Sequence, residues 1–324
     1  MEASIRLSRM GFNVTIIEKE ERLGGKLNQW DKLFPDGKRA KLILDNLHKS
    51  FNSSIKQMLG SEAVEISNNK GEFEISLEGN GIITSDAVLI ANGFSLFNAR
   101  RKEEYGYGIY DNVITSADLE YFFREGKKVR NFVCKDPKRI GIIHCVGSRD
   151  EKVGNIHCSQ VCCITAVKQA IELKEQFPNA EIFSFYMDLR MFGRKFEQIY
   201  KDAQTKHGIQ FIRGRLSEVF ENQDGSLLLK AEDTLLNKPL KMTVDLLILM
   251  VGMEAAANKF SAGLKLEQGA DKFFETADSN YQTSTSKIPG VFLAGTCTGP
   301  KTIENTFNDA RAAAFEIAEY LHKN

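Results

Sequence analysis

The sequence FNVTIIE, residues 12–18, is the stretch that most strongly indicates the class of fold. Its β-branched residues favour a strand, and the acidic Glu18 stands at the end of that strand. Residues 1–10 carry apolar side chains at helical spacing, and Gly11 suits the end of a helix. A helix that leads into a strand is the second half of a βαβ unit, in which an acid at this position accepts hydrogen bonds from the ribose of a dinucleotide.

The loop that follows this strand is rich in glycine. Gly24 and Gly25 stand beside Lys26, and backbone without side chains can approach a ligand closely. A complete dinucleotide unit also needs a first strand and a Gly-rich turn whose amides hold the pyrophosphate, but residues 1–10 begin inside the helix that follows that turn. We therefore expect a truncated start, with the N-terminal strand and the Gly-rich turn missing.

Strands and helices alternate over the rest of the sequence. Buried strands are predicted where short apolar runs end in small residues, and a pair of segments that begin with glycine predicts a hairpin. The predicted strands are 71–77 and 81–84 in the hairpin, then 87–93, 139–145, 181–187, 244–251 and 290–295. An alanine-rich helix is predicted over about residues 302–321. This alternation indicates an α/β protein with parallel sheets covered on both faces.

Composition and charge exclude several classes of protein. The 324 residues suggest about two domains, and a hydrophobic fraction of 42% is enough to build cores. There are 43 basic and 43 acidic residues, so the zero net charge argues against a general nucleic-acid binder. No apolar run approaches the ~18–20 residues that span a bilayer. Met1 is followed by Glu2 rather than by the apolar segment of a signal peptide, so we expect a cytoplasmic location.

Four of the six cysteines fall within residues 145–163. They are Cys145, Cys158, Cys162 and Cys163. A reducing compartment disfavours disulfides, so this clustering points to metal or redox chemistry. Residues 158–176 have helical spacing, which would place Cys158 and Cys162 one turn apart on one face and Cys163 about 100° around the helix. The remaining two, Cys134 and Cys297, are interpreted as a structural and a packing residue.

The residues alone leave the role of the cysteine cluster open. A helix N-terminus favours thiolates and an anionic cluster, and four thiolates suit either zinc or a [4Fe–4S] cluster. The spacing matches neither a ferredoxin run nor a paired zinc ribbon. Buried small hydrophobic residues are the third interpretation. His144 and His157 flank the cysteines and are equally well explained as ordinary loop residues.

Several motifs together resemble one family, the A subunits of heterodisulfide reductase. Besides the clustered cysteines, the motifs are CVGSRD at 145–150, KQA at 168–170, YMDLR at 186–190, FIRGR at 211–215 and AGTCTGPK at 294–301. The resemblance covers nearly the whole chain. It implies a thioredoxin-reductase-like FAD-binding fold with a second nucleotide-binding-like domain inserted. We place the first part of the FAD-binding domain at 1–130, the inserted domain with the cysteines at 131–245, and the second part of the FAD-binding domain at 246–324.

The resemblance also implies the cofactors and partners. It implies FAD and a [4Fe–4S] cluster held by the four clustered cysteines, in a protein that passes electrons within a larger complex. The expected partners are iron–sulfur subunits of the B and C type. The sequence has no second set of cysteines. In this respect the chain resembles the short form of the family, which occurs in sulfur-oxidising complexes and in a quinone-interacting membrane-bound oxidoreductase. Association with a membrane-bound partner and formation of a homodimer are left open.

The resemblance assigns further site residues. Lys168, on the same predicted helix as Cys163, is expected to approach the flavin as the catalytic residue. The helix after residue 301 would direct its free N–H groups at the reduced flavin and stabilise its negative charge. The residues expected to bind FAD are Glu18, Lys19, Gly24, Gly25, Lys26, Val64, Ala91, Asn92, Gly93, Gly295, Thr296, Gly299, Pro300, Lys301 and Ile303.

Two other functions compete with an electron-transfer flavoprotein. A stand-alone pyridine nucleotide-disulfide reductase would need a Cys-x-x-Cys pair and a second Gly-rich turn, and the sequence has neither. Residues 145–148, Cys-Val-Gly-Ser, stand where that turn would be. A non-catalytic, metal-bound scaffold is the third function. Absorbance spectra distinguish these functions, because flavin and iron–sulfur clusters are coloured and zinc is not.

Overall fold

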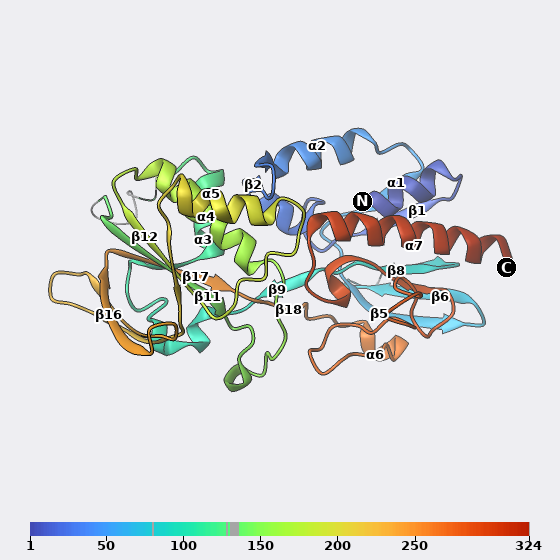
Figure 1. The fold of residues 1–324 in the computed structure, drawn as a ribbon. Helices are drawn as coiled ribbons and strands as arrows, with labels where there is room; N and C mark the ends of the chain where they lie inside the picture. The colour runs from blue at the N-terminus through green and yellow to red at the C-terminus, as the bar shows by residue number, and fades with distance from the viewer. Residues whose placement is uncertain (80, 128, 130–135, 324) are drawn as a thin grey trace. The chain divides into compact units, whose positions relative to one another are not determined.

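The computed structural model describes residues 1–79, 81–127, 129 and 136–323, and it divides the chain into two compact units. Unit 1 comprises residues 1–28, 41–95 and 254–324, and unit 2 comprises residues 29–40 and 96–253 (Figure 1). The predicted boundaries lay after residues 130 and 245. Unit 2 instead begins before the first of these boundaries and ends after the second. The reason is that β10 (Val113–Thr115) pairs with β17 (Leu246–Val251), and β17 pairs with β11 (Arg139–Val146) in the same sheet.

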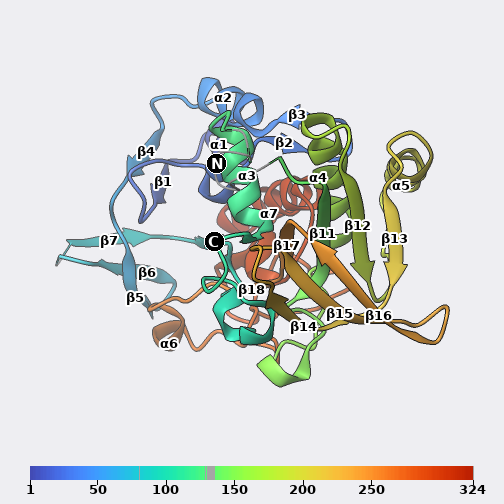
Figure 2. The same cartoon turned by 90° about the vertical axis from the view of Figure 1, so that its left-hand side faces the viewer.

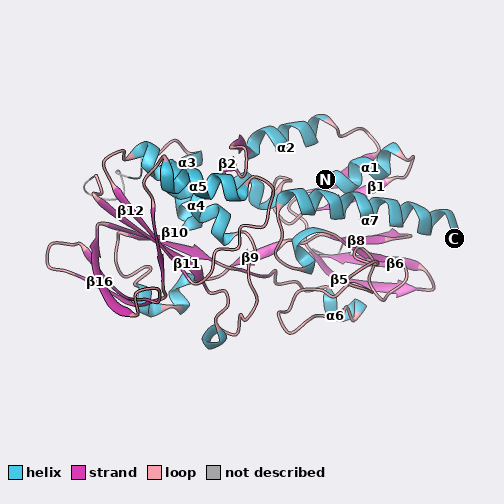
Figure 3. Cartoon of the chain, in the orientation of Figure 1, coloured by secondary structure: helices cyan, strands magenta, loops and turns pink. Residues whose placement is uncertain are grey.

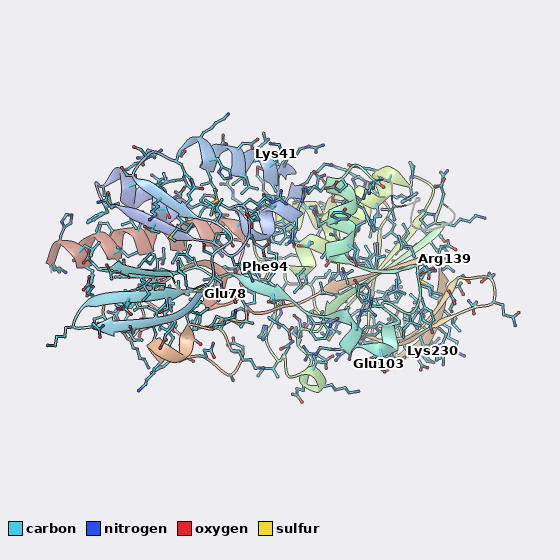
Figure 4. The ribbon with its side chains drawn as sticks, turned by 180° about the vertical axis from the view of Figure 1, so that it is seen from behind. Lys41, Glu78, Phe94, Glu103, Arg139 and Lys230 are labelled. Atoms are coloured by element: carbon cyan, nitrogen blue, oxygen red, sulfur yellow. The ribbon has the colours of Figure 1, made fainter. Side chains whose placement is uncertain are left out.

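Unit 2 is built on a five-stranded sheet in the order β10-β17-β11-β12-β13, and every pair in it is parallel. The two remaining strands are β12 (Glu181–Tyr186) and β13 (Gln210–Arg213). All six residues of β17 are buried, as expected for a central parallel strand covered on both faces. Arg139, labelled in Figure 4, begins β11, and its guanidinium lies 5.0 Å from the centre of the Phe183 ring.

Helices and a small antiparallel sheet cover the two faces of this sheet. On one face, Ile140 and Ile142 pack in a core with α3 (Ser116–Arg124), α4 (Cys162–Gln176) and α5 (Phe196–Thr205). On the other, Ile143 and Leu247 pack against the three-stranded meander β14-β15-β16. The meander strands are Leu216–Glu221, Leu227–Asp233 and Lys238–Val244; Figure 2 labels all three, and Figure 3 labels β16.

Unit 1 contains two parallel strand pairs and a three-stranded antiparallel sheet. The parallel pairs are β1 (Val14–Ile17) with β4 (Ile55–Met58), and β8 (Val88–Ile90) with β19 (Val291–Leu293). The antiparallel sheet is β5 (Ala63–Asn69), β6 (Glu72–Leu77) and β7 (Gly81–Ser85). The helices are α1 (Glu2–Arg9), α2 (Ala40–Lys49), α6 (Ser261–Leu264) and α7 (Ile303–Lys323). Ala3 and Leu7 of α1 share a core with Ala314 and Ile317 of α7.

Most of the predicted elements are confirmed. The predicted strands at 139–145, 181–187, 244–251 and 290–295 correspond to β11, β12, β17 and β19, and the predicted hairpin is β6 and β7. Two short strands, β9 (Phe94–Leu96) and β18 (Met253–Ala255), pair where the chain passes from one unit to the other. Among the described helices, none has the length and apolar character that a bilayer crossing requires.

The segment 29–40 leaves unit 1 and is held in unit 2 by a buried ionic network. It carries the short strands β2 (Lys32–Leu33) and β3 (Lys38–Arg39). Lys168 on α4 donates to the backbone oxygen of Lys32 at 2.9 Å and forms an ion pair with Glu120 on α3. The Lys168 ammonium also lies 3.3 Å from the Glu172 carboxylate, and the side chains of all three residues are largely buried. Lys168 therefore connects the segment 29–40 to helices α3 and α4 of unit 2.

We predict that Lys168→Met destabilises the protein by about 3–5 kcal/mol near neutral pH, because two buried carboxylates lose their main cation. Burial raises the pKa of Glu172, so the folded protein holds this proton more tightly than the unfolded chain. The loss of stability caused by the substitution should therefore shrink as the pH falls toward 4.5, the ordinary pKa of a glutamate. Denaturant unfolding at several pH values measures it. Lys174→Met is the matched control, because Lys174 is on the same helix and donates to the Ala180 carbonyl. An equal, pH-independent loss in both variants would contradict the network.

Candidate functional site

Cys145 lies at a bulge near the carboxyl end of β11. The register between β11 and β17 shifts between Ile143 and Val146, and Cys145 adopts a φ of 59° at that bulge. Arg149 and Gln160, in the loop that follows, also have positive φ values of 53° and 56°. Non-glycine residues in this region cost of order 1–3 kcal/mol each, and such residues cluster at functional sites. The bulge turns a buried thiol out of the normal alternation of the strand.

The backbone at the end of β17 makes hydrogen bonds to the segments that carry the cysteines. The Gly252 N–H donates to the Val146 oxygen at 2.8 Å, and the Met253 N–H donates to the Ser159 hydroxyl at 2.8 Å. The Met253 oxygen lies 2.9 Å from Nε2 of His157. A Cβ at Gly252 would lie 2.4 Å from the Ser148 hydroxyl, so only glycine fits there. The loop 147–159 is thereby fixed against the carboxyl edge of the sheet.

Cys162 and Cys163 are the first two residues of α4. The prediction that this helix starts at Cys158 is wrong, because Ser159 is held by Ser148 and by the end of β17 in a non-helical path. Cys158 and Cys162 are therefore not stacked on one helical face. The Cys162 sulfur lies 3.9 Å from the Val251 oxygen, whereas the Cys163 sulfur lies 3.7 Å from the Asp188 oxygen. The two sulfurs therefore lie near different backbone oxygens, whereas a shared cluster requires an irregular first turn of the helix that lets them converge.

The four thiols nevertheless share one neighbourhood, which we call the cysteine site. Burial raises the pKa of Cys145 to about 11, Cys163 adds to the rise, and the charge of Arg149 opposes it. Burial also raises the pKa of Cys162, with further contributions from the other three thiols. The pKa of Cys163 is raised by burial and lowered by the Arg190 N–H and by Arg149. Because these thiols act on one another, a bound cation would stabilise all of their thiolates together.

The donor chemistry of the site fits an iron–sulfur cluster. As the side chains stand, the described residues contain no group of three or more His, Cys, Asp or Glu that could hold a metal ion, so the fit rests on the chemistry of the donors. Four cysteine thiols are the usual donors of a [4Fe–4S] cluster. The Gln160 N–H already donates to the Cys158 sulfur at 3.3 Å. Nη1 of Arg149 is buried, and among the described residues no acceptor reaches it, which leaves a charged donor available for a sulfur atom.

Each of the two histidines beside the cysteines has its Nε2 atom in contact with another group of the protein. His144 is buried, its Nε2 lies 2.8 Å from the Ser184 hydroxyl, and burial lowers its pKa to about 4. His144 is therefore neutral near pH 7. His157 makes the contact to Met253 described above. Cys297 is buried in unit 1, its thiol donates to the Ala294 and Ile90 oxygens, and burial raises its pKa to about 12, in keeping with a packing role. Cys134 lies outside the described residues.

In unit 1, two loops predicted to bind FAD lie side by side. The strands β8 and β19 pair in parallel with Ile90 opposite Leu293, so their carboxyl ends meet at one edge. Ala91, Asn92 and Gly93 follow β8, and Gly295 and Thr296 follow β19. A Cβ at Gly93, whose φ is 76°, would lie 3.9 Å from the Thr296 hydroxyl. Loops at the carboxyl ends of parallel strands are where α/β folds bind nucleotides.

Three of the glycines predicted to bind FAD differ in what surrounds them. A Cβ at Gly24 would lie 2.6 Å from the Leu44 side chain, so this glycine is required by packing within the protein. A Cβ at Gly25 or Gly299, both with positive φ, would meet no described atom within 4 Å, so backbone there borders open space. Glu18 directly follows β1, and its carboxylate accepts from the Glu20 N–H at 3.1 Å. Lys19 and Lys26 belong to the same unit.

The other predicted FAD residues are distributed along unit 1. Lys301 pairs with Asp309 on α7 at 2.5 Å and donates to the Thr298 hydroxyl at 2.7 Å. Its charge is therefore partly neutralised within the chain. Ile303 is the first residue of α7, one residue later than predicted, and Pro300 is buried in the turn before it. Val64 lies in β5.

Lys168 lies in unit 2, whereas the predicted FAD residues lie in unit 1. Its ammonium is engaged by Glu120, Glu172 and the Lys32 oxygen. The family resemblance suggested the flavin role of Lys168, which stays a prediction, and spacing along a helix does not reveal carboxylates from α3. The sequence analysis also missed Arg149, Ser159 and Gly252 as site residues. Arg149 and Asp150 were within a motif already quoted, which was the available signal.

Similar solved structures share this architecture. The structure matches thioredoxin reductase from T. acidophilum with a TM-score of 0.67 at 18% sequence identity, covering 99% of this chain and 94% of that one. It matches thioredoxin reductase from Lactococcus lactis with a TM-score of 0.66 at 16% identity, covering 100% and 95%. The fold is therefore thioredoxin-reductase-like, as predicted. Residues 164–314 also match the family model described as pyridine nucleotide-disulphide oxidoreductase.

Sequence relatives are more specific. The chain is 41% identical over 239 residues to the A subunit of the H2/formate:CoB-CoM heterodisulfide,ferredoxin reductase of Methanococcus maripaludis, covering 71% of this chain and 36% of that protein. It is 32% identical to the second iron-sulfur A subunit of the CoB–CoM heterodisulfide reductase of Methanopyrus kandleri, covering 99% and 62%. The chain thus spans between a third and two thirds of the length of these relatives. The chain is therefore homologous to oxidoreductase subunits, the A subunits of heterodisulfide reductase.

Proposed function

We propose that the chain is the FAD- and [4Fe–4S]-containing electron-transfer subunit of a heterodisulfide-reductase-like complex. The observations that support the proposal are the position of Cys145 at the bulge of β11, the Cys162 sulfur 3.9 Å from the Val251 oxygen at the end of β17, and the effect of the thiols on one another's pKa values. The relative from Methanopyrus kandleri, whose name specifies an iron-sulfur protein, supports a cluster at this site. The other members of the complex would be iron–sulfur subunits of the B and C type, and the chain would be active only with them.

Unit 1 would hold the FAD. Glu18 at the end of β1 would accept hydrogen bonds from the ribose, and the open backbone at Gly25 would border the nucleotide. The paired loops after β8 and β19 would border the flavin, and the first turn of α7 would favour negative charge on it. FAD supplies a carrier that exchanges electrons singly or in pairs. Lys301, paired with Asp309, would add little positive charge to this end of the helix.

A stand-alone pyridine nucleotide-disulfide reductase is the second candidate, because the fold neighbours are thioredoxin reductases. That reaction uses a redox pair of cysteines at Cys-x-x-Cys spacing, which the sequence lacks. The loop after β11 is filled by the cysteine site and by Asp150, which pairs with the buried Lys102 at 2.9 Å. A non-catalytic metal scaffold is distinguished by its lack of flavin and cluster absorbance. We favour the electron-transfer protein, in a cytoplasmic complex.

We predict that Cys145→Ala, Cys158→Ala, Cys162→Ala and Cys163→Ala each lower the iron and acid-labile sulfide content of anaerobically prepared protein. Each substitution removes one of four thiolate ligands. Cys297→Ala is the matched control, because this buried thiol lies in unit 1 and donates to backbone oxygens. It should retain the iron content of the unsubstituted chain. Full iron retention in Cys163→Ala would refute the four-ligand assignment.

We also predict that NADH and NADPH do not rapidly reduce the flavin of the isolated chain. Unit 2 carries the cysteine site where a nicotinamide-binding domain would present a Gly-rich turn, so amides that hold a pyrophosphate are missing from that loop. Stopped-flow absorbance at the flavin bands under anaerobic conditions measures the rate, with dithionite as the positive control. Flavin bleaching by NADH at catalytic rates would favour the stand-alone reductase instead.

A further inference from the structure

Arg149 is connected to three parts of the cysteine site at once. Its backbone N–H donates to the His157 oxygen at 3.0 Å, directly before Cys158. Its Nη2 donates to the Asp188 carboxylate at 2.7 Å, and the backbone oxygen of Asp188 accepts from the Cys163 thiol. Its side chain also lowers the pKa of the Cys145 thiol, four residues earlier in the chain, through its charge and through a hydrogen bond. One residue therefore links, through its backbone and its side chain, the segments that lie beside three of the four cysteines.

The ion pair with Asp188 alone does not account for Arg149. The Asp188 side chain is 49% exposed, and an exposed pair contributes little to stability. Asp188 is also 3.6 Å from the guanidinium of Arg213, and Arg190 acts on it as well. Two arginines therefore contact this carboxylate and a third acts on it by its charge, so positive charge exceeds negative charge among these four residues. That excess would be balanced by an anion in the cysteine site.

The orientation of Arg149 adds a second, independent observation. Its side chain is only 22% exposed, and within the described part of the chain its buried Nη1 has no acceptor. A buried charged donor without a partner is costly, and proteins seldom keep one without a ligand or a mechanism that uses it. A sulfur of a bound cluster would satisfy Nη1, because thiolate and sulfide sulfurs accept hydrogen bonds. A [4Fe–4S] cluster with four thiolates is anionic, and its negative charge increases when it is reduced.

We propose that Arg149 is a positioning residue that donates to the bound cluster and raises its reduction potential. This inference rests on the proposed function, because it requires a cluster at the cysteine site. A nearby cation stabilises the more negative reduced state more than the oxidised state, and hydrogen bonds to cluster sulfurs act in the same direction. The pair with Asp188 holds the guanidinium in place, while the backbone contact to His157 holds the loop.

The test compares Arg149→Gln, Arg149→Lys and Arg213→Gln in the full chain after anaerobic cluster assembly. Arg213→Gln is the matched control, because it removes an arginine from the same Asp188 carboxylate. Iron and sulfide are counted first, and each cluster is then titrated with a chemical reductant while its electron paramagnetic resonance signal is followed. We expect Arg149→Gln to lower the equilibrium constant for reduction about tenfold, which is about 59 mV for one electron. Arg149→Lys should recover most of this loss, and Arg213→Gln should change the constant less than twofold.

The outcomes separate this role from the proposed function. Loss of iron in Arg149→Gln alone, with retention in Arg149→Lys and Arg213→Gln, also supports a positioning role. Equal potentials in Arg149→Gln and Arg213→Gln, both with full iron, would overturn the role of Arg149 and leave the proposed function intact. Equal loss of iron in all three variants would show that these arginines only maintain the local structure. That result would also overturn the positioning role of Arg149. An unsubstituted chain that takes up neither iron nor sulfide would overturn the proposed function and this inference with it.

Discussion

The chemistry of unit 2 depends on the parallel pairing of β11 with β17. The two strands run side by side from Ile140 opposite Leu246 to Val146 opposite Val251, and both are buried along most of their length. Their carboxyl ends must therefore emerge at the same edge. At that edge the backbone of residues 251–253 contacts the Cys162 thiol, the Ser159 hydroxyl and the His157 ring. Residues 157–162 and 251–253, far apart in sequence, are therefore neighbours because β11 and β17 end at the same edge of the sheet.

The same principle arranges unit 1 on a smaller scale. The strands β8 and β19 are about two hundred residues apart in sequence, yet their parallel register brings the loops after them together. Each unit thus presents its candidate site at the carboxyl ends of parallel strands, which is the general location of sites in α/β folds. In unit 2 the loops bring sulfur and arginine to that edge. In unit 1 they bring glycine and small polar residues, which leave the backbone accessible.

The sequence predicted those features that local patterns determine. Short apolar runs located β11, β12, β17 and β19, and the alanine-rich run located α7 to within two residues at each end. Features set by contacts between distant residues were missed. The start of α4 is fixed by hydrogen bonds of Ser159 to Ser148 and Met253, and helical spacing carries no record of those bonds. Lys168 is engaged by Glu120, 48 residues away in sequence, for the same reason.

The central claim is that the fold assembles four thiols into one iron–sulfur site, and anomalous X-ray diffraction tests it most directly. Crystals of anaerobically prepared protein would be measured on both sides of the iron absorption edge. We expect one compact group of iron peaks bonded to the sulfurs of Cys145, Cys158, Cys162 and Cys163. The absence of iron density there, in protein that contains iron by analysis, or a single peak at the zinc edge instead, would contradict the account.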